Sequence, residues 1–140
     1  MSRDALDALY RRWLPGLWNA EPGAMAGLAR EIFAADAVAH WGAGKDVHGP
    51  EGIAEQVRMA TQLFDDLEVT LDVGPIVDGD LVAARWTFSG SYRGGIPGAS
   101  ATPGTRVAYP GTDVVRARDG VFVEYWPQGA NDELMHQLGC

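Results

Sequence analysis

The spacing of apolar residues changes once along this chain, near residue 67, and that change limits the folds open to it. Before this point apolar residues recur every three or four positions, as on one side of a helix. After it they alternate with polar residues, beginning with Leu67, Val69, Leu71 and Val73 between Glu68, Thr70 and Asp72. A period of two is typical of a strand with one buried face. Helices followed by strands predict an α+β fold with helices covering one face of a sheet.

Helices are expected in the first part of the chain and again at its end. The first begins near Asp4 and carries Leu6, Leu9, Trp13 and Leu17 on one side, with Pro15-Gly16 bending or ending it. Pro22 and Pro50 suit the first turns of a second and a third helix. Between those two helices, Val38 to Trp41 is expected to be a short strand, followed by a turn at residues 42–44. A short last helix is expected from Asn131, a good N-cap, to Gly139.

Two Asp-Gly pairs, at residues 78–79 and 119–120, predict tight hairpins and so an antiparallel four-stranded meander. Counting outward from the first turn pairs Trp86 with Leu71, Phe88 with Val69, Arg85 with Asp72 and Ala84 with Val73. Counting from the second pairs Asp113 with Trp126, Val115 with Glu124 and Ala117 with Phe122. The glycine-rich segment from Arg93 to Gly104 is expected to be a loop that covers a binding site.

The length and the net charge of the chain limit its domain organisation and the classes of molecule it can bind. With 140 residues, the chain matches one domain, residues 1–140. No apolar stretch reaches the ~20 residues that span a bilayer, and the N-terminus does not resemble a signal peptide, so a cytoplasmic protein is expected. The net charge of −8 argues against nucleic acid or an anionic membrane as partner. The one cysteine, Cys140, leaves no internal disulfide.

Asp113 is the residue whose position in the pattern is least expected. It shares one face of its strand with Val107, Tyr109 and Val115, whereas the arginines of that strand share the other face. A carboxyl group inside an apolar and aromatic environment has a raised pKa, as a general acid or base near neutral pH requires. The alternative is a structural residue, satisfied by a backbone amide, a tyrosine hydroxyl or a water, or turned outward by a bulge at Gly111.

Other side chains could line a pocket for a flat, hydrophobic ligand. The aromatic candidates are Trp86, Phe88, Tyr92, Tyr109 and Trp126, and the two tyrosines can also hydrogen-bond an oxygen of the ligand. His40 is a further candidate at the rim. His40 and His48 lack a third metal ligand at a usable spacing, so no metal site is predicted. Neither a hydrolase triad nor a phosphate-binding loop is found.

Several short motifs, in order along nearly the whole chain, resemble a known family. The most specific are Asp113 and Arg116 as Asp-x-x-Arg, the following Asp-Gly, Glu124 to Trp126 as Glu-x-Trp, and Gln137-Leu-Gly139. The chain resembles the SnoaL-like polyketide cyclases of the nuclear-transport-factor-2-like superfold. That resemblance implies a cone-shaped, curved sheet around a deep apolar pocket, a homodimer, no cofactor, and a catalytic aspartate at the position of Asp113. Many relatives carry a histidine where Tyr92 stands here.

Three functions are compatible with these observations. The first is a cofactor-free cyclase or isomerase of a polyketide-like carbonyl compound in secondary metabolism, with Asp113 moving the proton. The second is an enzyme that opens an epoxide or forms an ether, which would be favoured if a second carboxylate such as Glu124, or an asparagine that positions a water molecule, reached the pocket. The third is a protein that binds a hydrophobic metabolite without changing it.

Overall fold

The computed structural model describes residues 1–42 and 44–140. The turn expected at residues 42–44 contains Ala43, which lies outside this description. In chain order the elements are α1 (Arg3–Arg11), η1 (Arg12–Leu17), η2 (Pro22–Ala24), α2 (Met25–Ile32), β1 (Phe33–His40), β2 (Asp46–His48), α3 (Gly49–Thr61), β3 (Phe64–Asp78), β4 (Leu81–Tyr92), β5 (Arg106–Arg118), β6 (Val121–Gly129) and α4 (Asn131–Gln137).

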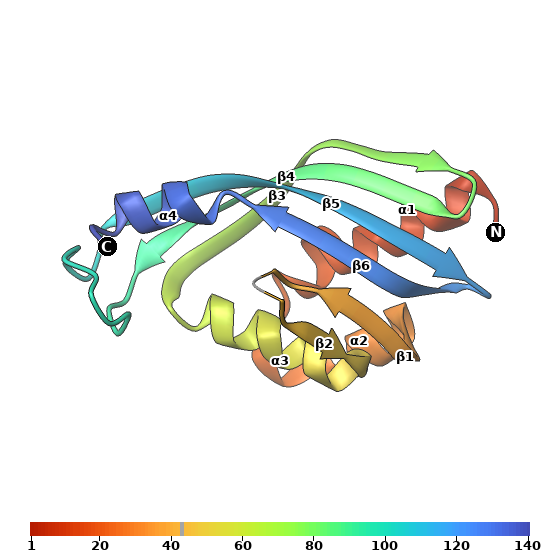
Figure 1. Cartoon of the computed structure of the whole chain (residues 1–140), viewed down its shortest axis with the longest axis horizontal. Coiled ribbons are helices and arrows are strands. Elements are labelled where there is room, and N and C mark those ends of the chain that lie inside the picture. Colours follow the sequence, from red (N-terminus) through yellow and green to blue (C-terminus); the bar gives the residue numbers. More distant parts are fainter. Residues whose placement is uncertain (43) are drawn as a thin grey trace.

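The strands form one curved, open sheet with the order β2-β1-β6-β5-β4-β3 across the described residues. The meander from β3 to β6 is antiparallel, as predicted. β1 pairs with β6 in parallel, and β2 adds an antiparallel edge strand that the sequence did not predict, so the sheet is mixed. α1, α2 and α3 lie along one side of the sheet and α4 lies at one end of it (Figure 1). The α+β class is therefore confirmed.

The N-terminal helix forms and stops for local reasons. The hydroxyl of Ser2 caps it by accepting the Ala5 N–H at 3.1 Å. Leu6, Leu9 and Tyr10 form its buried side. Helical geometry breaks at Leu14, where φ is −134° and ψ is 116°, directly before Pro15. The predicted bend is thus present, and η1 continues the chain in a new direction along the sheet.

The second helix ends one residue earlier than its apolar pattern indicated. Ile32 closes α2, and Phe33 already has extended geometry as the first residue of β1. The predicted strand from Val38 to Trp41 is accordingly the last part of a longer strand that ends at His40. Both Ile32 and Phe33 are buried, so their apolar character fits either element.

Each hairpin follows the predicted register over only part of its length. In the first, Val69 pairs with Phe88 and Leu71 with Trp86, as predicted, but nearer the turn irregularities pair Val73 with Arg85, so the predicted Arg85–Asp72 and Ala84–Val73 pairs are wrong. In the second, Ala117 pairs with Phe122, but a bulge after Arg116 shifts the rest by one residue. Asp113 therefore faces Pro127, Val114 faces Trp126 and Val115 faces Tyr125, which corrects the predicted Asp113–Trp126 and Val115–Glu124 pairs.

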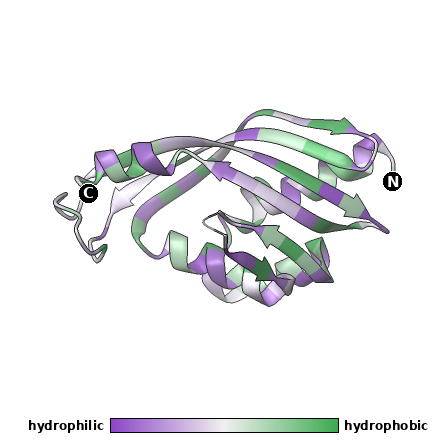
Figure 2. Cartoon of the chain, viewed as in Figure 1, coloured by the Kyte–Doolittle hydropathy of each residue, from purple (hydrophilic) through white to green (hydrophobic). Residues whose placement is uncertain are grey.

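The core lies between the helices and the concave side of the sheet. Buried residues alternate with more exposed ones along β4 and much of β5. Both hydrophobic and hydrophilic residues occur along these strands (Figure 2). Aromatic rings fill much of this core, with Trp13 in edge contacts with Phe33 and Tyr125 at 5.0 and 5.3 Å between centroids. Among the described helices, none is long and apolar enough to cross a membrane.

Candidate functional site

Asp113 lies near the middle of β5 and is completely buried, on the face that the alternation predicted. Within the described part of the chain it is the one polar or charged residue of the buried set. A carboxyl group without partners in such a place would be strongly destabilising, so its contacts determine what it can do.

Four side chains donate hydrogen bonds to this carboxyl group within the described residues. Oδ1 accepts from the Tyr125 hydroxyl at 2.9 Å and from Trp86 Nε1 at 3.1 Å. Oδ2 accepts from the Tyr10 hydroxyl at 2.8 Å and from Trp13 Nε1 at 3.4 Å. The donors come from α1, η1, β4 and β6, so Asp113 ties helices to sheet. We call Tyr10, Trp13, Trp86 and Tyr125 the donor quartet.

Two opposing effects set the protonation of Asp113. Burial raises the pKa of its carboxyl group, and hydrogen bonds from Tyr10, Trp86, Tyr125 and Trp13 lower it, with burial the larger effect. Burial and the nearby Asp113 charge also raise the pKa of both Tyr10 and Tyr125. Both tyrosines therefore remain protonated near neutral pH and available as donors.

A cavity of about 360 Å³ opens beside this cluster, under the end of the sheet near α4. Its volume is at the lower end of the range of ~300–1,000 Å³ usual for small-molecule sites. Apolar side chains line most of it, including Trp18, Trp41, Leu63, Phe64, Ile96 and Leu134. Polar groups come from Gln56, Tyr109, Gln128 and Asn131. No aspartate, glutamate, lysine, arginine or histidine belongs to the described lining.

Trp86 and Tyr125 belong to both the cavity wall and the donor quartet. Asp113 is not itself part of the described lining. The carboxyl group thus lies behind two aromatic side chains that connect it to the cavity through hydrogen bonds. Any exchange of a proton between Asp113 and a ligand has to pass these two residues or displace them.

Tyr109, four residues before Asp113 on the same strand, also belongs to the cavity lining and carries a hydroxyl group. No hydrogen bond to this hydroxyl is found within the described residues, and burial raises the pKa of Tyr109 to about 12. Its ring packs on Phe88, with centroids 5.0 Å apart, and near Trp86, at 6.0 Å. Tyr109 is therefore a neutral donor that a ligand oxygen can engage. Phe88 supports this wall from behind, beside a small void.

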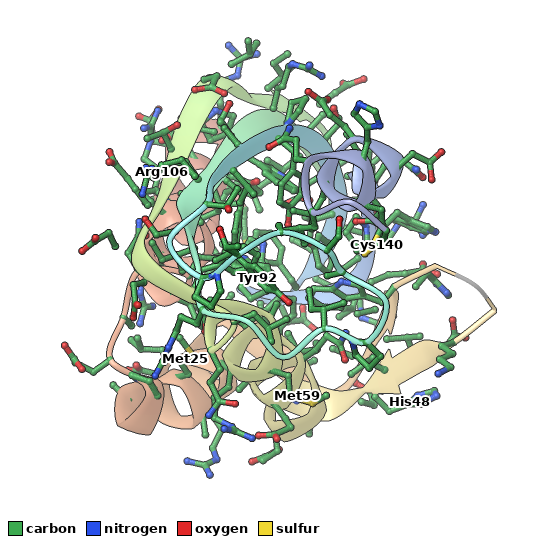
Figure 3. The ribbon with its side chains drawn as sticks, turned by 90° about the vertical axis from the view of Figure 1, so that its left-hand side faces the viewer. Met25, His48, Met59, Tyr92, Arg106 and Cys140 are labelled. Atoms are coloured by element: carbon green, nitrogen blue, oxygen red, sulfur yellow. The ribbon has the colours of Figure 1, made fainter. Side chains whose placement is uncertain are left out.

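The loop after β4 closes one end of the cavity. Tyr92 lies at the centre of the view in Figure 3, with the loop crossing in front of the sheet between α3 and α4. The Tyr92 hydroxyl accepts the Ile96 N–H at 2.8 Å, and Ala101 donates its N–H to the Leu138 carbonyl at 3.0 Å. Tyr92 itself is buried and outside the described cavity lining, so here it holds the loop.

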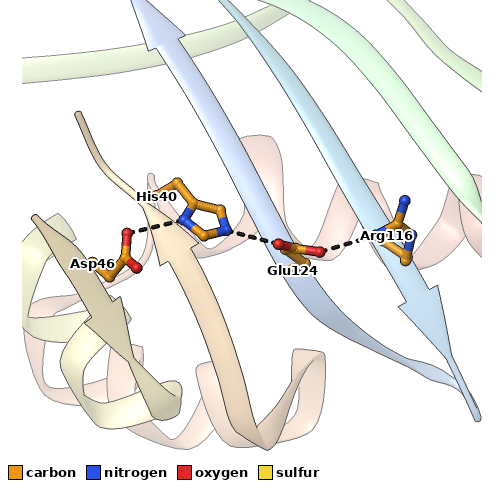
Figure 4. A network of polar contacts seen from close by, with 4 residues as sticks. All are labelled: His40, Asp46, Arg116 and Glu124. Atoms are coloured by element: carbon orange, nitrogen blue, oxygen red, sulfur yellow. Dashed lines mark hydrogen bonds and ion pairs between the residues drawn. The ribbon is translucent and has the colours of Figure 1, made fainter. Parts of the chain in front are cut away.

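His40 and Trp126 lie together, but on the outer face of the sheet and away from the cavity. His40 contacts Asp46 at 2.9 Å through Nδ1 and Glu124 at 2.8 Å through Nε2, while Arg116 donates to Glu124 at 2.9 Å (Figure 4). The imidazole stacks on Trp126 with centroids 5.7 Å apart. Hydrogen bonding to Glu124 and then to Asp46 raises the pKa of His40. Neither residue is within the described cavity lining.

Histidines and acids do not form a metal site in the described chain. No group of three or more histidine, cysteine, aspartate or glutamate side chains is placed to hold an ion among residues 1–42 and 44–140. His48 and His136 are exposed.

Three members of the donor quartet were not among the predicted site residues. Tyr10 and Trp13 lie on the apolar side of the first helical segment, three positions apart, where their spacing indicated core packing alone. Tyr125 was missed because the predicted register placed Trp126 opposite Asp113, whereas the bulge after Arg116 shifts that register by one residue. The available signal was the presence of Trp and Tyr on apolar faces, since these side chains need a hydrogen-bond partner when buried.

We compared the chain with known protein families and solved structures. The profile of the SnoaL-like domain matches residues 5–125. The chain belongs to the SnoaL-like family. TsrD from Streptomyces laurentii is 27% identical, with 99% of this chain and 98% of that chain covered and a TM-score of 0.77. IdmH from Streptomyces antibioticus, proposed to be a polyketide cyclase, is 27% identical over 98% of this chain and 97% of its own, with a TM-score of 0.74.

More distant SnoaL-like proteins share the fold. A protein from Jannaschia sp. CCS1, proposed to be a SnoaL-like polyketide cyclase, is 20% identical, with 100% and 96% of the two chains covered and a TM-score of 0.84. A search of curated protein sequences finds no match. The resemblance predicted from the Asp-x-x-Arg and neighbouring motifs is therefore confirmed at the level of family and fold.

Proposed function

We propose that this SnoaL-like protein is a cofactor-free cyclase or isomerase of a polyketide-like carbonyl compound, and that Asp113 is the group that gains and loses the proton. The observation that carries this proposal is a fully buried carboxyl group with a raised pKa, joined by hydrogen bonds to two residues of a cavity wall. The 27% identity with IdmH, itself proposed to be a polyketide cyclase, supports the reaction class.

The proton would travel through Tyr125. Its hydroxyl donates to Asp113 Oδ1 at 2.9 Å, and its side chain also forms part of the cavity wall. In the proposed step, the Tyr125 oxygen takes the proton from the carbon next to a substrate carbonyl while its own proton passes to Asp113. The carbon–hydrogen bond breaks, an enolate forms, and Asp113 becomes neutral. The reverse transfer protonates the alkoxide that forms when the ring closes, so no net proton is consumed.

Tyr109 would stabilise the developing negative charge on the substrate oxygen. Its hydroxyl is a cavity donor with a pKa of about 12, so it donates a hydrogen bond without losing its proton at neutral pH. The ring of Trp86, held in place by its bond to Asp113, would fix the plane of the substrate.

The test is deuterium exchange at the acidic carbon of β-tetralone, followed by proton NMR in deuterated buffer at neutral pH. We expect Asp113→Asn and Tyr125→Phe each to slow protein-catalysed exchange by about 10²–10⁴-fold, the usual contribution of acid–base catalysis. Asp119→Asn is the matched control, because it neutralises an aspartate at the hairpin turn of β5 and β6 and should leave the rate unchanged. Undiminished exchange in Asp113→Asn would remove the proposed role of this residue.

A binding protein without catalysis is the second candidate, favoured by the absence of Asp113 from the described cavity lining and by its four donors. In that case β-tetralone binds and no exchange is seen with any variant. For the epoxide alternative, Glu124 is not available as a second carboxylate, because it lies on the outer face in contact with His40 and Arg116. Asn131 belongs to the described cavity lining, so the asparagine that would also favour this alternative is present.

A further inference from the structure

A second hollow of about 240 Å³ lies on the other side of the aromatic wall of the main cavity. It is bordered by the segment from η1 to α2, the end of α3 and the start of β3. Ala20, Met25 and Leu67 give it an apolar floor, and Thr61, Gln62 and Arg93 stand around it. Nothing in the proposed proton transfer uses this space.

Trp18 and Phe64 are the residues that line both hollows in the described chain. The two spaces are therefore separated by the thickness of aromatic side chains. Turning either ring aside would join them into one longer cavity.

Trp18 differs from the tryptophans of the donor quartet in how it is held. Trp13 and Trp86 donate their indole N–H groups to Asp113, whereas Trp18 Nε1 is buried with no partner among the described residues. Such an orphan donor in a native fold indicates a missing acceptor, because a buried N–H without a partner is costly. A small void of about 10 Å³, lined by Leu14, Val69, Trp86 and Phe88, also borders this indole.

The backbone beside Trp18 is held by hydrogen bonds, whereas the indole is held by packing alone. The next residue, Asn19, clamps β3 by donating Nδ2–H to the Val69 carbonyl and accepting the Val69 N–H, both at 3.1 Å. The indole is held by edge contacts with Trp13 and Phe88, at 5.8 and 6.3 Å between centroids. A ring on a fixed backbone, packed but not hydrogen-bonded, can change its rotamer without moving the chain around it.

We infer that the second hollow is a subsite for an aliphatic arm of the ligand whose ring occupies the main cavity, and that Trp18 donates its N–H to an oxygen where arm and ring meet. The ligand class is an aromatic ring bearing an acyl chain. The inference rests on the proposed function only in placing the ring in the main cavity. The flat wall of Trp18 then selects ligands by the length and the attachment of this arm.

The test compares binding of acetylnaphthalene and hexanoylnaphthalene to the whole protein by isothermal titration calorimetry. We expect the longer ketone to bind at least about tenfold more tightly, since burial of two methylene groups already gives that factor. Thr61→Trp should fill the subsite and abolish this preference while affinity for acetylnaphthalene stays the same. Met59→Trp is the matched control on the same helix, because Met59 is exposed, and it should keep the preference.

Trp18→Phe tests the donor separately. It keeps an aromatic wall and removes the N–H, so it should weaken the binding of hexanoylnaphthalene more than that of hexylnaphthalene, which lacks the oxygen. Equal affinity for the two ketones, or a preference that survives Thr61→Trp, would overturn the subsite. Failure of the proposed function is seen instead as absent β-tetralone exchange, and it leaves the chain-length preference intact.

Discussion

At the scale of one residue, Asp113 has to be stable inside the core and still be able to exchange a proton. Removing a carboxylate from water costs several kcal/mol, and a hydrogen bond to a charged group returns ~1.5–3 kcal/mol. Four donors therefore offset much of that cost without removing the rise in pKa that burial causes. The carboxyl group of Asp113 is thus held in one position, and its raised pKa favours the exchange of a proton.

The position of Trp86 depends on a glycine across the sheet. Gly111 pairs with Trp86, and a Cβ atom at Gly111 would lie 2.1 Å from Cζ2 of the indole. Gly111→Ala must therefore displace the ring and break its bond to Asp113. We expect unfolding free energy to fall by about 1–3 kcal/mol, the usual cost of overpacking. Urea unfolding followed by circular dichroism measures it.

Gly27→Ala serves as the control for that substitution. Gly27 is exposed within α2, and a Cβ there meets nothing within 4 Å. The same change of residue should stabilise the protein by about 0.5–1 kcal/mol there, because glycine weakens a helix interior. A Gly111→Ala variant as stable as the wild type would show that Trp86 is free to move and that the donor quartet is not rigid.

The sequence predicts the buried face of Asp113 but not its donors, for a physical reason. Alternation within one strand assigns a face without knowledge of any partner. Tyr10 and Trp13 come from a helical segment about a hundred positions earlier, and their contact with Asp113 depends on how that segment crosses the sheet. The single residue could therefore be found from local pattern, whereas the cluster around it could not.

At the scale of elements, one bulge decides which aromatic residue joins the site. The extra residue of β6 opposite Arg116 and Ala117 reverses the faces of all later residues, because side chains alternate along a strand. The Tyr125 side chain consequently lies on the same side of the sheet as Asp113 and reaches its carboxyl group, whereas Trp126 lies on the outer side beside Val114. The strand pairs predicted from the Asp119-Gly120 turn are correct up to the bulge and wrong by one residue beyond it, because the local sequence contains no signal for the bulge.

The outer-face network links four neighbouring strands. Asp46, His40, Glu124 and Arg116 come from β2, β1, β6 and β5, respectively. Because both carboxylates raise the pKa of His40 above its ordinary 6.5, the charged imidazole stabilises the fold fully below that pH. This contribution is lost as pH rises through the raised pKa.

His40→Gln should therefore lower the unfolding free energy by about 1 kcal/mol at acid pH, the upper end for exposed ion pairs, and by less at alkaline pH. Urea unfolding at several pH values between about 5 and 9 measures the difference. His48→Gln, at an exposed histidine of β2, is the control and should show no such trend. A difference between wild type and His40→Gln that stays constant with pH would contradict the network as the cause.

At the scale of the whole molecule, the order of helices and strands could be predicted from the change in apolar spacing. The pairing of β1 with β6, which completes the sheet, could not. β1 joins β6 in parallel although Phe33 and Phe122, which pair, are far apart in sequence. That pairing and the bulge in β6 shape the curved sheet over the helices, and the cavity forms at the end where the loop and α4 meet (Figure 1). Long-range pairing of this kind has no local sequence signal.

The pKa shifts of the folded protein predict how its stability depends on pH. Asp113 has a folded pKa raised above 3.8, so its contribution is present at low pH and is lost as pH rises through the raised value. His40 loses its contribution in the same direction, above 6.5. Glu51 and Glu55, whose pKa values are lowered by Arg30 and Arg58, act oppositely and lose theirs as pH falls below about 4.5.

Stability should therefore be greatest at about pH 4–5 and decline toward alkaline pH, where the net charge of −8 adds repulsion. Urea midpoints from about pH 4 to 9 test this, with the double variant His40→Gln and Asp113→Asn as comparison. Because that variant lacks both groups whose proton binding favours the fold, most of its alkaline decline should disappear. The part that remains should shrink in high salt, which screens the net charge. A wild-type midpoint that rises as pH increases from about 5 to neutral would contradict the raised pKa of Asp113, and the proton transfer proposed for this residue would lose its physical basis.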